Sequence, residues 1–169
     1  MMNTVLAGMV LLGLAAAPAL AGQQPTTAEK ADKLMAGGKL PDENFVMKAA
    51  NGGMAEVELG KLAIEKAGSD EVKKFGRRMV DDHSKANDEL KSIAEQKGVK
   101  LPTKEHTGKW SSDKAYIDAM VKDHEKDLAE FQEEAKTGSD PDVKKFAEDT
   151  AKMVQEHLDL AKETQSKLK

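Results

Sequence analysis

The chain has 169 residues, with 26 Lys and Arg, 30 Asp and Glu, four His and no Cys, and its net charge is −4. This length predicts one domain of ordinary size with a real core. The absence of Cys excludes disulfides, thiol catalysis and cysteine-bound zinc. An acidic chain with only 4% aromatic residues lacks the basic, stacking surface of nucleic-acid binders, so no nucleic-acid partner is expected.

The first 21 residues are typical of an export signal. They contain no charged side chain, have an apolar run over residues 5–14, and end in Ala19-Leu20-Ala21. This predicts a signal peptide over residues 1–21. No Lys or Arg precedes the apolar run, which leaves the true start codon open. An uncleaved anchor is the alternative, although the run is short for a membrane span. We expect export to the periplasm and no transmembrane segment after cleavage, and association with the outer membrane or cell surface stays open.

Residues 22–42 are polar and contain Gly37-Gly38 and Pro41, which predicts a flexible linker. The domain itself is expected over residues 43–169. A first helix opens at Pro41-Asp42-Glu43 and ends at Gly68, because proline and acidic residues favour the first helical turn. Its expected buried positions follow three- and four-residue steps: Phe45, Ala49, Gly52, Leu59 and Leu62.

Three further helices follow from capping residues, glycine stops and apolar stripes. Their expected ranges are residues 69–98, 111–138 and 140 onward. Residues 68–75 and 138–146 are similar in sequence, which predicts two similar helical hairpins. The connection over residues 99–111 is long enough to run the length of a helix. The sequence thus predicts an all-α four-helix bundle, and a ferritin-like crossover and a simple up-down-up-down order both remain open.

Three of the four histidines lie in one repeated pattern, M-V-x-[DE]-H. His83, His124 and His157 each follow a methionine by four residues, so each pair shares one helix face. Glu58 holds the matching position in the first helix, four residues after Met54. The levels of these four polar residues coincide only if the two hairpins point in opposite directions, as a crossover requires.

One carboxylate and three imidazoles in a helical core predict a metal site. The expected ligands are Glu58, His83, His124 and His157, and the alternative is a buried hydrogen-bond network. Methionine selects Cu(I), so copper is the first expectation and zinc or iron the second, although methionine is also common core filler. The weaker candidates are the four methionines and the acids that precede the histidines: Met54, Met79, Met120, Met153, Asp82, Asp123 and Glu156.

The acids Asp82, Asp123 and Glu156 are candidates for orienting a neighbouring imidazole, and the alternative is that they face solvent. Glu56 and Asp127 are weaker candidates still. The residues three before the histidines are Val80, Val121 and Val154. These departures from the Glu-x-x-His pattern argue against a standard di-iron oxidase.

The segment GGMAEVELG at residues 52–60, the M-V-x-[DE]-H segments and the Gly98-Val99 to Leu101-Pro102 turn resemble one family. It is the bacterial domain-of-unknown-function family 4142, whose members are often labelled putative outer-membrane proteins. The resemblance covers about residues 43–163 and implies an exported, ferritin-like four-helix bundle. This chain has Ala151-Lys152 and Met153 where members tend to have Leu-Pro and Thr.

The sequence therefore predicts an exported helical bundle that binds a transition metal for sequestration or stress protection. A small metal-dependent redox enzyme is one alternative. A metal-free envelope-stress or chaperone-like interaction protein is another. No other catalytic or nucleotide-binding motif is present, so binding is favoured over catalysis. The protein partner is left open, and a homodimer is one option.

Overall fold

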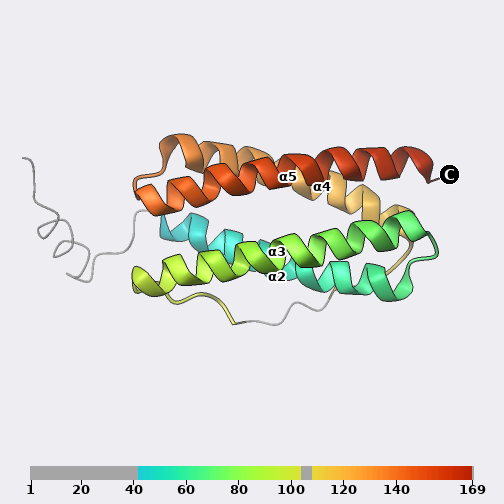
Figure 1. Cartoon of the computed structure of the whole chain (residues 1–169), viewed down its shortest axis with the longest axis horizontal. Helices are drawn as coiled ribbons and strands as arrows, with labels where there is room; N and C mark the ends of the chain where they lie inside the picture. Colours follow the sequence, from blue (N-terminus) through green and yellow to red (C-terminus); the bar gives the residue numbers. More distant parts are fainter. Residues whose placement is uncertain (1–41, 104–107, 169) are drawn as a thin grey trace, which may run out of the picture.

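A computed structural model describes residues 42–103 and 108–168. The predicted signal peptide and the linker up to residue 41 lie outside these residues. So does His106, the one histidine that is not part of the repeated pattern. Four helices form an all-α bundle (Figure 1), and the described ranges contain no strand. The helices are α2 (Glu43–Lys66), α3 (Asp70–Gln96), α4 (Asp113–Thr137) and α5 (Pro141–Lys167). The predicted fold class is therefore confirmed, and none of these helices is long and apolar enough to cross a membrane.

The helices begin where the capping residues predict. The hydroxyl of Ser69 accepts the backbone N–H of Val72 in α3, and Ser112 caps α4 in the same way. Asp140 caps α5, and Pro141 fills the first helical position, where a missing N–H has no cost. Local side-chain chemistry thus fixes both hairpin turns.

The long connection joins opposite ends of the bundle. Gly68 and Ser69, in the turn between α2 and α3, donate backbone N–H groups to Asp113 at the start of α4 (3.0 and 2.7 Å). At the opposite end, the backbone N–H of Asp140 donates to Asp42 at the start of α2 (2.6 Å). The two hairpins therefore point in opposite directions, and α3 and α4 run parallel (Figure 1). This is the crossover topology of ferritin-like bundles.

The buried face of α2 differs from the predicted one by a rotation of one residue. The predicted positions are only half-buried, and the buried ones are Val46, Ala50, Glu56, Gly60 and Ala63. The reason is close helix packing, since a Cβ at Gly60 would lie 2.8 Å from the carbonyl oxygen of Gly76 in α3.

The large apolar side chains of α2 pack elsewhere. A Cβ built at Gly108 would lie 2.8 Å from Leu59 and 3.0 Å from Leu62. The connection between α3 and α4, which we call the crossover segment, therefore covers these leucines at Gly108. The small residues of α2 face α3. Periodicity alone does not distinguish a face that packs on helices from one that packs on a connection.

Two apolar clusters fill the bundle, one toward each end. The cluster near the first hairpin turn includes Phe75, Met79, Tyr116, Ile117, Met120 and Ala161. The cluster near the second turn includes Val46, Leu90, Val143 and Phe146. Between the two clusters, each helix contributes one buried titratable residue: Glu56, His83, His124 and His157. We call these four residues the polar layer.

Candidate metal centre

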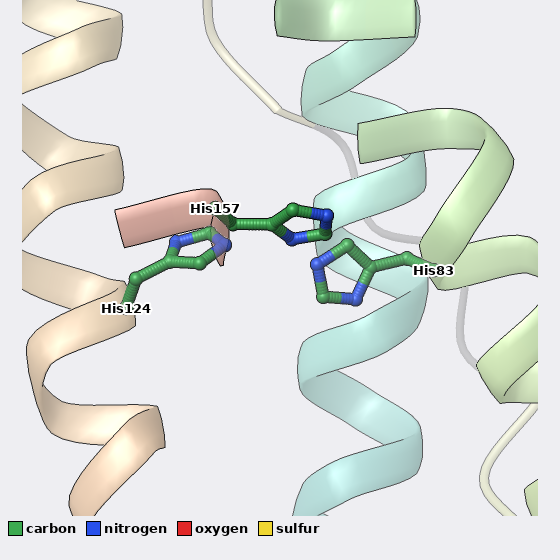
Figure 2. A group of neighbouring side chains, drawn as sticks. All are labelled: His83, His124 and His157. Carbon is green, nitrogen blue, oxygen red and sulfur yellow. The ribbon is translucent and has the colours of Figure 1, made fainter. Parts of the chain in front are cut away.

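Three histidines converge in the polar layer from three different helices. His83 of α3, His124 of α4 and His157 of α5 point toward one another in Figure 2, where α2 passes behind them. One ring nitrogen from each lies within 4.8 Å of the other two. The ring centroids are 5.3 to 5.9 Å apart. Nitrogen ligands of a single ion lie at most about 4.2 Å apart, so small side-chain rotations would bring the rings onto one ion.

Hydrogen bonds orient two of the three rings. His124 Nδ1 lies 2.9 Å from the carbonyl oxygen of Met120, which can only accept, so Nδ1 carries the proton. His157 Nε2 lies 3.0 Å from the Asp82 carboxylate and donates to it. The lone pairs therefore sit on His124 Nε2 and His157 Nδ1. Partners of this kind fix the tautomer and the ring plane of metal-binding histidines.

One nitrogen of each ring has no hydrogen-bond partner among residues 42–103 and 108–168. These nitrogens are His83 Nε2, His124 Nε2 and His157 Nδ1. Each ring is nearly inaccessible to solvent, with 6% exposure for His83 and 1% for the other two residues. A buried polar atom left unpaired costs about 1–3 kcal/mol. Three such ring nitrogens facing one point form a donor set that suits a transition-metal cation.

Burial keeps the imidazoles neutral. It lowers the pKa of His83 to about 3, and the neighbouring His157 and His124 add to the effect. Burial and His157 lower the pKa of His124 to about 4. Burial also lowers the pKa of His157, although Asp82 opposes the shift. At neutral pH the rings therefore present lone pairs without first losing a proton, as metal binding requires.

The prediction that Glu58 faces the histidines is wrong. Its side chain is 43% exposed and pairs with Lys61 at 2.6 Å. The rotation of α2 places Glu56 in the core instead, where it is 5% exposed and its Oε2 atom has no partner. Burial, with Asp127 and Asp123 adding to it, raises the pKa of Glu56 to about 8. The carboxyl of the polar layer is thus Glu56, and it is mostly protonated at neutral pH.

The methionines fall into two groups. Met79 and Met120 are fully buried, one helical turn before His83 and His124, and belong to the apolar cluster near the first hairpin turn. Met54 lies away from the polar layer, in an outer groove beside α3. Met153 is half-buried. The structure therefore does not bring the four methionines together.

Of the acids expected to orient imidazoles, only Asp82 contacts one. Asp123 is exposed, and Glu156 pairs with Arg78 at 2.9 Å. Arg78 also pairs with Asp82. Burial raises the pKa of Asp82, but hydrogen bonds from His157 and Arg78 outweigh it, so the net shift is downward. Sequence reasoning missed Arg78, although its position four residues before Asp82 is the spacing of a helical ion pair.

Neither the search of curated proteins nor that of solved structures found a match. A family model described as a domain of unknown function, DUF4142, matches residues 23–164. The match begins within the predicted linker and spans all four helices except the last residues of α5. The chain therefore belongs to the DUF4142 family, as the resemblance in its helical segments predicted.

Proposed function

We propose that this protein binds one transition-metal ion through His83, His124 and His157. The observation that carries the proposal is the convergence of three buried, neutral imidazoles, each with a ring nitrogen that has no partner in the described part of the chain. The neutral rings need no deprotonation to bind. With three protein ligands, the ion keeps at least one coordination position for another ligand.

A purely structural histidine network is the main competing explanation. In such a network the rings would donate to and accept from one another, because buried polar atoms are nearly always paired. Here the donating nitrogens of His124 and His157 point to Met120 and Asp82 instead. The accepting nitrogens are left facing the same space, which supports a cation over a network.

The donor set suits copper, zinc and iron, all of which imidazole binds well. Copper is the first ion to test, because Met79 and Met120 are buried one turn from two of the histidines. The signal-like residues 1–21 support export to the periplasm, where such a protein would sequester metal or protect against stress. A bundle with no catalytic motif beyond the metal site favours binding over catalysis.

The test is metal analysis of the mature chain purified from periplasm without chelator. Bound metals are measured by mass spectrometry, and Cu(I), Zn(II) and Fe(II) are then titrated separately into metal-free protein. We expect one ion per chain, with a rise in melting temperature that follows ligand concentration. His83→Ala combined with His157→Ala should abolish both effects. Absence of binding and of stabilisation by all three ions would refute the proposal.

A second candidate function, a metal-free interaction protein, is favoured by one observation. An apolar groove of about 640 Å³ lies between α2, α3 and the start of the crossover segment. Its walls include Ala50, Ala94, Val99, Leu101 and Pro102. If no ion binds, this groove is the surface on which to seek a partner by crosslinking in periplasmic extract.

A further inference from the structure

A narrow cleft connects the polar layer with the bundle surface. It has a volume of about 40 Å³ and is lined by all four helices, with His83 among its lining residues. Apolar side chains, among them Phe45 and Val154, form much of its wall. A volume of this size holds only a few water molecules or one small ion. The cleft therefore has room for small species beside His83 and excludes larger ones.

The charged residues of the cleft come from α2 and α4. Asp127 and Glu130 of α4 and Lys48 of α2 all line it. Lys48 and Glu130 pair at 3.8 Å, with Lys48 69% exposed, so they mark its solvent side. Asp127 is half-buried and shares the cleft with His83. A second, broader pocket continues along the same seam and adds Glu133 and Glu134.

The net charge of this seam is negative. Four carboxylates from α4 and one lysine of α2 line the two pockets, and Lys126 of α4 also pairs with Glu130 at 3.6 Å, so the carboxylates outnumber the lysines. Clefts lined by one sign of charge between low-dielectric walls concentrate ions of the opposite sign. The seam therefore attracts cations and repels anions.

We propose that the metal ion reaches the three histidines through this cleft, and that the Asp127 carboxylate captures it before His83 does. This inference rests on the proposed metal-binding function and adds the path to it. Asp127 is a positioning residue for uptake: it holds the cation during transit, and the bound ion rests on the histidines. The rate of uptake should therefore depend on Asp127, whereas the final affinity should not.

The uptake rate is measured by stopped-flow mixing of the metal-free full chain with Zn(II) in low salt. A competing chromophoric chelator is then added to report the zinc that is still unbound. Asp127→Asn should slow uptake about tenfold with the equilibrium affinity unchanged within about twofold. The matched control is Asp88→Asn, an identical charge change at an exposed site on α3 outside the cleft. It should take up zinc at the unmodified rate. Raising the salt concentration should shrink the difference between the two variants, because salt screens the field.

A steric variant tests the path separately from the charge. Ala49→Val adds two methyl groups to the cleft wall and should slow uptake while leaving affinity and net charge unchanged. Uptake at the unmodified rate in both Asp127→Asn and Ala49→Val, with normal affinity, would overturn the route and leave the proposed function standing. No zinc binding by the unmodified chain at equilibrium would overturn both.

Discussion

Glu56→Gln is the substitution that most directly tests the position of α2. In the folded protein burial raises the pKa of Glu56 to about 8, against an ordinary value of 4.5. Because the folded pKa is the higher one, the folded state holds a proton that the unfolded chain releases between these two values. The stabilising effect is complete below about pH 4.5 and is lost as the pH rises through about 8.

The size of this effect follows from the two pKa values. One pKa unit corresponds to about 1.4 kcal/mol. Between about pH 5 and about pH 7.5, the folded state keeps the proton of Glu56 while the unfolded chain releases it. The free energy of unfolding therefore falls by about 3 kcal/mol over this range. This is a large fraction of the about 5–15 kcal/mol typical of a whole domain. Glutamine cannot ionise, so the stability of Glu56→Gln relative to the unmodified protein should grow by about 3 kcal/mol over this range.

The assay is urea unfolding of metal-free protein, in the presence of chelator, at both pH values. Burial of the glutamine amide has its own cost, but that cost is the same at both pH values and cancels in the difference. Glu58→Gln is the matched control, because Glu58 is partly exposed and two residues away. It should show no comparable growth. Equal pH dependence in the two variants would refute the assignment of Glu56 to the polar layer.

Three further predictions concern the site and its support. Asp82→Asn should weaken metal binding about 10–100-fold by calorimetry, because it removes a carboxylate that orients His157; an equal loss in exposed Asp81→Asn would contradict this. Gly76→Ala should lower the urea midpoint, since its Cβ would lie 2.8 Å from a carbonyl oxygen of α2, whereas Gly52→Ala, with nothing within 4 Å, should not. Asp42→Ala should cost about 1–3 kcal/mol in thermal unfolding, because two backbone N–H groups before α5 lose their acceptor; an unchanged melting temperature would refute that role.

The ends of the helices were predictable because local chemistry decides them. Ser69, Ser112 and Asp140 cap their helices with their own side chains, and nothing distant is needed to identify them. The convergence of the three histidines was also predictable. The four-residue step from methionine to histidine fixes the helix face of each histidine, and the crossover fixes its level. Both predictions depend on spacing along regular helices.

The face of α2 was not predictable from the same periodicity. Apolar residues occupy two adjacent stripes of this helix, and the larger ones, such as Leu59, pack under the crossover segment. The deciding contact is between Gly60 and Gly76, which lie far apart in sequence. Glu58 and Glu56 are two residues apart, which is about 200° around the helix, so the wrong choice of face exchanged Glu58 for Glu56. A carboxyl in the layer was foreseen, but it was assigned to Glu58, with Glu56 only a weaker candidate.

The polar layer works against the stability of the bundle. Its histidines leave buried ring nitrogens without partners. Glu56 stays protonated in the folded state, so the free energy of unfolding falls as the pH rises. Apolar side chains of similar volume at these four positions would pack without either penalty, as replacements of buried polar groups show. Binding of an ion to the folded state reverses the balance, because it stabilises the bundle in proportion to the logarithm of ligand excess. The layer that weakens the metal-free bundle is thus the one through which an ion would strengthen it.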